Sequence, residues 1–117
     1  MEEFLFKINV LGTDYGVIAD TQDNNVQLRN CDAYIAPEFK LIVLDKANKD
    51  RHQMKVLAHE IVHAFLYESG LDVESWAHNE EIVDWIAIQL FKINSVVKDS
   101  HKKLKPFYTK RKVTKNK

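Results

Sequence analysis

The spacing of the apolar residues changes near position 50, and this change limits the folds that the chain can adopt. Before it, apolar residues stand in short runs of the kind found in strands. After it, they recur every three or four residues, which is typical of a helix with one buried face. The recurrence predicts one helix over about residues 50–68 and a second over 79–97. Asp50 and Asn79 are the predicted N-caps, and Gly70 is the predicted residue that ends the first helix.

The first part of the chain contains four candidate strands. Residues 4–11, FLFKINVL, and 14–20, DYGVIAD, are separated by a Gly-Thr pair that predicts a hairpin turn. Residues 32–36, DAYIA, and 40–45, KLIVLD, follow after a polar loop. Strands followed by two helices predict an α+β fold with a small, mostly antiparallel sheet.

The charge of the chain is unevenly distributed. Its 117 residues include 17 Lys and Arg and 17 Asp and Glu, but nine basic residues and one Asp lie from Lys98 onward. Residues 98–117 therefore carry a net charge of +8, and residues 1–97 carry −8. We expect one folded domain, 1–97, and a basic C-terminal tail, 98–117, in which Pro106 prevents a continuous helix. Such a tail can bind a nucleic acid, an acidic partner or its own acidic domain.

The cysteine content and the N-terminus favour a cytoplasmic location. The single cysteine, Cys31, cannot form an internal disulfide, and the first ten residues lack the basic start and apolar run of a secretion signal. No apolar run approaches the roughly 20 residues that a membrane-spanning helix needs. We therefore expect a soluble, cytoplasmic protein that has no membrane partner.

The segment HEIVH, residues 59–63, carries the strongest chemical signal. His59 and His63 are four residues apart on the predicted helix, so both imidazoles can bind one zinc ion. Glu60 is rotated about 100° around the helix from His59, where it can reach a water bound to the metal. Zinc lowers the pKa of such a water, and Glu60 is then the candidate general base for hydrolysis of a peptide bond.

The segment NEEIVD, residues 79–84, offers the third zinc ligand. Glu80 and Asp84 share one face of the second predicted helix. Glu80 is the expected ligand, while Asp84 is expected to accept a hydrogen bond from a ligating histidine in the second shell. Glu81 is the alternative ligand. Acidic residues at a helix start also complement the helix dipole, which is a structural reason for the same pair of glutamates.

HEIVH and NEEIVD together resemble the gluzincin class of zinc metallopeptidases, whose thermolysin-like members carry HExxH on one helix and NExxxD on the next. Within this class, KLIVLD, KVLAHEIVHAFLYESGL and EEIVDWIA resemble the ImmA/IrrE group of compact metallopeptidases and related small proteins of phages and mobile elements. The resemblance covers about residues 32–92. It implies a minimal zincin, a hydrolase whose small sheet packs on the HExxH helix and a second ligand-bearing helix, with a protein or peptide as substrate.

Two other functions are compatible with these residues. An SprT-like, DNA-associated protease takes a downstream histidine as third ligand, and His78 lies fifteen residues after His63. A catalytically silent, zinc-containing binding protein would recognise a protein or DNA through its surface and basic tail. In either peptidase, Tyr67, one helical turn beyond His63, is a candidate for stabilising the oxyanion of the transition state.

Overall fold

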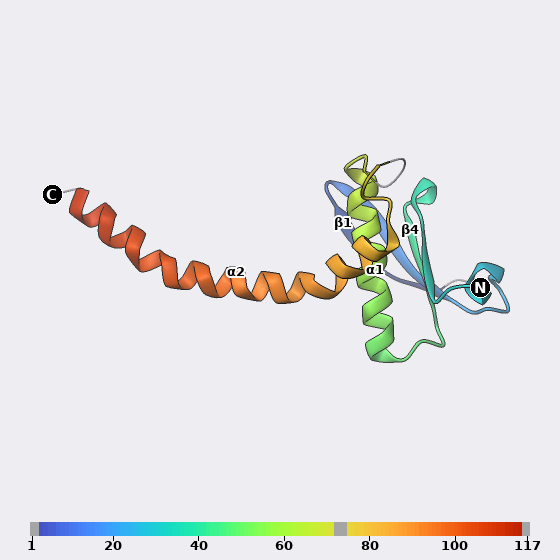
Figure 1. The fold of residues 1–117 in the computed structure, drawn as a ribbon. Coiled ribbons are helices and arrows are strands. Elements are labelled where there is room, and N and C mark those ends of the chain that lie inside the picture. Colours follow the sequence, from blue (N-terminus) through green and yellow to red (C-terminus); the bar gives the residue numbers. More distant parts are fainter. Residues whose placement is uncertain (1–2, 72–74, 116–117) are drawn as a thin grey trace.

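The structure is a computed structural model and describes residues 3–71 and 75–115. Within these residues the chain is α+β, with one small sheet and two helices, in agreement with the class predicted from the sequence (Figure 1). The elements in chain order are β1 (Glu3–Val10), β2 (Thr13–Asp20), the 3-10 helix η1 (Val26–Arg29), β3 (Ala33–Ala36), the 3-10 helix η2 (Pro37–Phe39), β4 (Leu41–Asp45), α1 (Asp50–Glu68) and α2 (Glu80–Lys115).

The four strands form one mixed sheet in the order β1-β2-β4-β3. β1 pairs with β2 and β3 pairs with β4 in antiparallel fashion, as expected, but the central pair, β2 and β4, is parallel. Parallel neighbours need a crossover connection, and here the segment that contains η1, β3 and η2 provides it. β3 is therefore an outer strand although it precedes β4 in the sequence.

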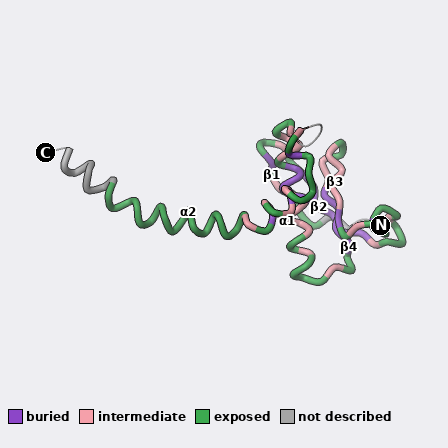
Figure 2. The backbone as a smooth tube through the Cα atoms, viewed as in Figure 1, coloured by how far each residue is buried: buried purple, intermediate pink, exposed green. Residues whose placement is uncertain are grey.

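The core lies between the sheet and α1. Successive strand residues point to opposite faces of a sheet, so Ile42 and Leu44 face α1 while Val43 packs on the other face with Ile18 and Leu28 of η1. Figure 2 shows the buried residues gathered in the strands. The cluster beside α1 consists of Val10, Tyr15, Val17, Ala33, Ile42, Leu44 and Ala64.

The hairpin between β1 and β2 turns at Leu11 and Gly12, one residue earlier than the predicted Gly-Thr turn. Both turn residues have positive φ, 52° at Leu11 and 93° at Gly12. A two-residue hairpin loop with positive φ at both positions matches the right-handed twist of the strands, and Asn-Gly is its preferred sequence. The turn was predicted one residue too late because the apolar Leu11 extends the strand pattern. In the structure Leu11 lies in the turn and is 61% exposed.

Replacing Leu11 by Asn is expected to stabilise the protein by about 1 kcal/mol. Asn tolerates the left-handed conformation better than Leu, which is disfavoured there by about 1–2 kcal/mol. The free energy of unfolding from urea denaturation measures the effect. Leu11→Ala is the control, since it removes the exposed side chain but keeps a residue disfavoured at positive φ. Equal stability of the two variants would contradict the assigned turn.

Helix α1 ends as predicted but begins differently. Gly70 has a φ of 75°, its N–H bonds to the Tyr67 carbonyl at 3.0 Å, and the N–H of Leu71 bonds to the Leu66 carbonyl at 2.9 Å. These paired bonds define a Schellman motif, which confirms Gly70 as the terminating residue. Asp50 is the first helical residue and not the N-cap, which is Lys49. In this position the Asp50 carboxylate still complements the helix dipole.

The C-terminal end of α1 is fastened to the sheet by Glu68. Its carboxylate accepts hydrogen bonds from the Tyr15 hydroxyl at 2.6 Å, from Lys40 Nζ at 2.9 Å and from the Thr13 hydroxyl at 3.1 Å. The bond from Tyr15, with those from Lys40 and Thr13, holds the pKa of Glu68 below its ordinary value. The contact fixes the end of α1 that follows the HEIVH segment.

The stability that Glu68 contributes is expected to depend on pH. Because its pKa is lowered on folding, the contribution is complete above the unfolded-state pKa of about 4.3 and is lost as the pH falls through the folded-state pKa. Glu68→Gln should therefore be less stable than wild type at pH 7, with a difference that shrinks in acid. Urea denaturation across this pH range measures it. The exposed Glu38→Gln variant is the control, and a pH-independent difference for Glu68→Gln would contradict the assignment.

Helix α2 is much longer than the predicted 79–97. Its start is as predicted, because Asn79 Oδ1 accepts a hydrogen bond from the N–H of Ile82 at 3.1 Å. The helix then continues to Lys115 and leaves the rest of the fold as a single extended element (Figure 1). The boundary drawn at residues 97 and 98 thus falls inside one helix.

Pro106 lies inside α2, so the expectation that it prevents a continuous helix was wrong. Proline removes one backbone hydrogen bond, but its fixed φ is close to the helical value. The surrounding lysines favour helix, and Lys103 pairs with Asp99 one turn earlier at 3.2 Å. These local preferences act against the effect of the proline.

Among the described residues, no helix combines the length and the apolar character that crossing a membrane requires.

Candidate metal centre

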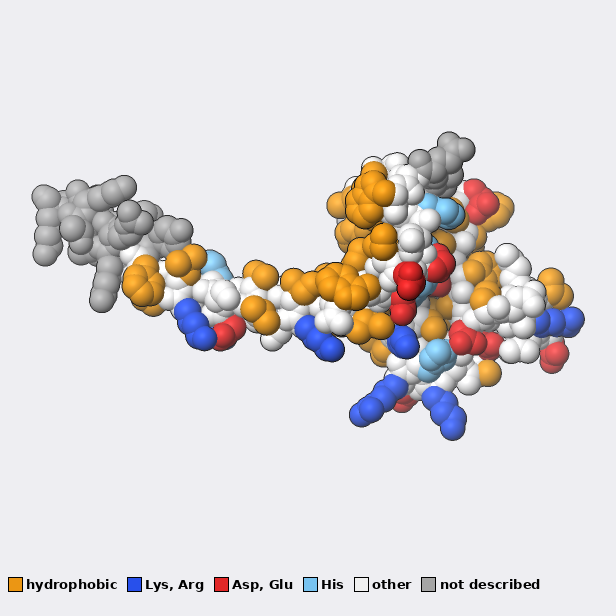
Figure 3. All heavy atoms as spheres, viewed as in Figure 1, with side chains coloured by type: hydrophobic (Ala, Val, Ile, Leu, Met, Phe, Trp, Pro, Cys, Tyr) orange, Lys and Arg blue, Asp and Glu red, His pale blue; other side chains and the backbone are white. Residues whose placement is uncertain are grey.

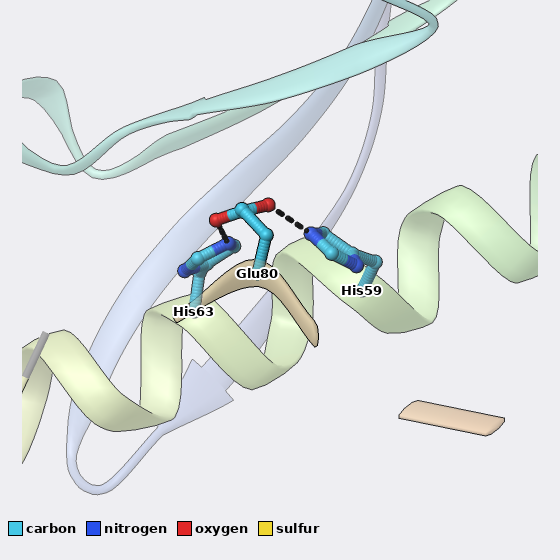
Figure 4. Close-up of side chains that lie close together, drawn as sticks. All are labelled: His59, His63 and Glu80. Atoms are coloured by element: carbon cyan, nitrogen blue, oxygen red, sulfur yellow. Dashed lines mark hydrogen bonds and ion pairs between the residues drawn. The ribbon is translucent and has the colours of Figure 1, made fainter. Parts of the chain in front are cut away.

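Three side chains predicted as zinc ligands meet between the two helices. α1 supplies His59 and His63, whose ring centroids are 4.9 Å apart, and the first residue of α2 supplies Glu80. One carboxylate oxygen of Glu80 lies 2.9 Å from His59 Nε2, and the other lies 2.9 Å from His63 Nε2 (Figure 4). The three donor groups therefore converge on one point, although 21 residues separate His59 from Glu80.

Apolar packing between α1 and α2 places Glu80 beside the histidines. Val62 of α1 is buried against Val83 and Ala87 of α2, and Ala58, Leu66 and Ile86 surround them. Val62 immediately precedes His63, and Val83 lies three residues after Glu80. The Asn79 cap fixes the first turn of α2, so the helix presents Glu80 at its start.

Burial and charge differ across the three residues. The His63 side chain is 9% exposed and that of His59 is 19% exposed, whereas that of Glu80 is 72% exposed. Partial burial raises the pKa of Glu80, but the hydrogen bond from His59 and the charges of both histidines outweigh it and hold the pKa below its usual value. The site thus contains an ionised carboxylate beside two imidazoles.

Asp84 stands behind His59, one helical turn after Glu80. Its Oδ1 is 3.5 Å from His59 Nδ1, while Nε2 of the same ring faces Glu80. The two ring nitrogens therefore have different neighbours. A ligating histidine commonly donates its second N–H to a carboxylate, which fixes the ring orientation. This is the relation expected for Asp84 from its spacing.

Glu60 lines the same open cleft as His59, Glu80 and Asp84. The residue is 8% exposed. The cleft has a volume of about 320 Å³, and its remaining walls are formed by Cys31, Asp32, Ala33, His52, Lys55 and Val56. His63 does not line the cleft, so of the two histidines near Glu80 only His59 faces it, together with the Glu60 carboxylate. A cleft of this size has room for a water molecule and a peptide carbonyl.

The donor set suits zinc. Two neutral imidazoles and one carboxylate are the protein ligands of many catalytic zinc sites, which leave the fourth position open. The ligand atoms of His59, His63 and Glu80 all lie within 4.8 Å of one another. Since zinc binds each ligand at about 2.0–2.2 Å, small side-chain movements would bring all three onto one ion.

The alternative site residues lie outside this group. In the part of the chain that the structure describes, the potential metal ligands that converge are His59, His63 and Glu80, without Glu81 or His78. His78 is exposed, in the turn that precedes α2. Tyr67 faces Lys40, whose Nζ is 4.9 Å from the centre of its ring, and it does not line the cleft.

The sequence did not indicate one pair of cleft residues. His52 Nε2 lies 2.6 Å from Asp32 Oδ2, between the start of α1 and the residue before β3. His52 is eight residues before Glu60, close to two full turns of a helix, so helical spacing alone could have placed both on one side of α1. Its partner could not have been found this way, because the Asp32 contact depends on the sheet.

Cys31 also lines the cleft, with features of a protonated thiol. Its Sγ lies 3.2 Å from the Gln27 carbonyl as a hydrogen-bond donor. Burial raises the pKa of the Cys31 thiol. Because zinc binds the thiolate, these features disfavour Cys31 as a ligand.

Comparisons of the chain with protein-family models, with curated proteins and with solved structures found no match.

Proposed function

We propose that this protein is a zinc metallopeptidase that hydrolyses a peptide bond in a protein partner. The observation that carries the proposal is the convergence of His59, His63 and Glu80, with Glu60 in the same cleft. Two resemblances support the same function: HEIVH and NEEIVD resemble the gluzincin class, and KLIVLD, KVLAHEIVHAFLYESGL and EEIVDWIA resemble the ImmA/IrrE group.

Each residue has a defined task in this proposal. Zinc held by His59, His63 and Glu80 would leave one position for water and lower the pKa of that water to near 7. Glu60 accepts the water proton during attack on the peptide carbonyl and then donates it to the departing amine. Asp84, whose Oδ1 lies 3.5 Å from His59 Nδ1, would accept a hydrogen bond from that N–H and so keep Nε2 directed into the site.

The outer strand β3 favours a peptide as substrate. β3 is at the edge of the sheet, and Ala33, its first residue, lines the cleft with His59 and Glu60. An extended peptide can add to an exposed strand edge through backbone hydrogen bonds. Pairing with β3 would carry the peptide past Glu60, and we infer that the substrate binds in this way.

Metal content and cleavage together test the proposal. Purified wild-type protein should contain stoichiometric zinc and cleave members of a library of internally quenched peptides. A chelator should stop cleavage, and added zinc should restore it. His59→Ala should lose the zinc, whereas the control His101→Ala, an exposed histidine on α2, should retain it.

Two results would contradict the proposal. If purified wild-type protein contains no stoichiometric zinc, the proposed metal site is wrong. Zinc-containing protein that cleaves no peptide in the library would favour the catalytically silent binding protein.

A further inference from the structure

The outer part of α2 carries an apolar stripe, interrupted at Ser100, that the rest of the described chain leaves exposed. Figure 3 shows apolar side chains along much of this helix outside the domain, and Figure 2 shows its exposure. The exposed fractions are 46% at Leu90, 47% at Ile93, 58% at Val97, 47% at Leu104 and 66% at Phe107. A helix with such a stripe gains most of its stability from packing, so the stripe requires a partner.

The overall dimensions of the chain also indicate that the outer part of α2 lacks a packing partner within the described residues. The chain extends over 70 × 32 × 25 Å and has a radius of gyration of 19.0 Å. A compact chain of this length has a radius of gyration of about 13 Å. The excess comes from α2, which extends away from the domain as a single helix (Figure 1).

The stripe has the spacing of a coiled coil. Ile86, Leu90, Ile93, Val97, Leu104 and Phe107 follow one another at intervals of four, three, four, seven and three residues. Ser100 fills the one position missing from the seven-residue interval between Val97 and Leu104. With it, these residues form the a/d pattern of a heptad repeat. We call the six apolar residues the α2 seam. A heptad pattern of this kind pairs with another helix.

An apolar groove continues the seam at the base of α2. It has a volume of about 410 Å³, and its walls combine α1 and α2 side chains: Ile61, Val62, Phe65, Leu66, Ile86 and Leu90. Phe65 is 40% exposed there. The groove can accept a large apolar side chain that arrives along the seam.

The charge distribution indicates which partner helix binds the α2 seam. The chain is neutral, yet residues 98–117 carry +8 and residues 1–97 carry −8. An antiparallel pair of α2 helices brings the basic end of each copy to the acidic domain of the other, whereas a parallel pair brings the two basic ends together. Opposite charges attract and like charges repel. A second copy of this chain in antiparallel orientation therefore covers the apolar seam and also pairs the basic end with the acidic domain.

We propose that two copies of the chain associate through antiparallel pairing of their α2 seams. The a/d pattern allows a two-fold register in which Leu90 lies opposite Phe107 of the second copy and Ile93 lies opposite its Leu104. Phe107 of each copy then enters the groove at the base of the other. In this register residues 110–112, Lys-Arg-Lys, come level with residues 85–87 of the other α2, next to the turn that carries Glu80, Glu81 and Asp84.

Sedimentation of the full-length protein over a range of concentrations tests the association. Wild type should be a dimer, and Ile93→Glu should raise its dissociation constant by about 100-fold or more, because two carboxylates enter an apolar interface. Ile88→Glu is the matched control. Ile88 is 40% exposed against 47% for Ile93, and it lies about 140° away around the helix. The dimer should also weaken with added salt, which screens the charge pairing.

Cross-linking tests the orientation and does not depend on how Ile93→Glu folds. In a Cys31→Ser background, the double variant Ile93→Cys/Leu104→Cys should form an intermolecular disulfide, while Ile93→Cys alone should not. A disulfide in the single variant would show parallel helices and overturn the proposal. Wild type that sediments as a monomer up to its solubility limit, or equal effects of Ile93→Glu and Ile88→Glu, would also overturn it.

Discussion

Glu60→Gln should abolish zinc-dependent peptide cleavage while the protein retains its zinc. Glutamine has nearly the shape of glutamate but cannot accept a proton, so the variant removes the general base and little else. General acid–base catalysis commonly contributes about 10²–10⁴-fold to a rate, and the cleavage rate should fall by a factor in this range. Metal analysis and cleavage of the quenched peptides, performed on the same preparation, measure both properties.

Glu81→Gln is the control for Glu60→Gln. Glu81 is an exposed carboxylate next to Glu80 and lies outside the converging ligand group. Its loss should change neither zinc content nor cleavage. If Glu60→Gln instead loses zinc together with activity, Glu60 supports the metal and is not the base.

Glu80→Gln is expected to give the second large effect, a loss of zinc affinity. Glu80 supplies the only carboxylate of the converging group within the described residues. Its replacement by Gln removes the negative charge that contacts both His59 and His63. The decrease should exceed the roughly 10–100-fold that follows loss of a hydrogen-bonding partner behind a ligand. Competition with a zinc-sensitive chelator measures the dissociation constant.

Three comparison variants identify the third ligand. Asp84→Asn should cause the smaller decrease of about 10–100-fold, because Asp84 acts through His59. Glu81→Gln and His78→Ala should bind zinc like wild type. A larger loss in His78→Ala than in Glu80→Gln would support the SprT-like arrangement and reject the one proposed here.

The site residues on α1 were accessible to sequence analysis because one helix fixes their relations. His59 and His63 are held on one face by a spacing of four residues, and Glu60 follows from the same geometry. Glu80 was a weaker prediction, because its position depends on how α2 packs on α1. The buried Val83 and Ala87 determine that packing, and only the folded chain shows it.

The fold was predictable where local chemistry is unambiguous. The bounds of α1, the Asn79 cap and the Gly70 end follow from helical spacing and from residues with strong positional preferences. The parallel pairing of β2 with β4 had no local signal, since sheet order depends on contacts between distant segments.

Two errors have a common cause. Leu11 was predicted to lie in a strand because it is apolar, but it occupies a turn. Pro106 was predicted to interrupt the helix, but α2 continues past it. In both cases the average preference of one residue type was outweighed by its neighbours. Gly12 and the strand pairing fix the hairpin, and the lysine-rich sequence around Pro106 favours the helix.

The contact between α1 and α2 would link metal occupancy to a packing equilibrium. Glu80 reaches the histidines only while Val83 and Ala87 remain against Val62, and a contact between two elements can open locally at lower free energy than the whole fold. An open molecule has two ligands instead of three. The apparent dissociation constant of the proposed zinc would therefore be the intrinsic constant divided by the closed fraction. If the site holds zinc as proposed, its affinity depends on buried methyl groups as well as on the atoms that touch the ion.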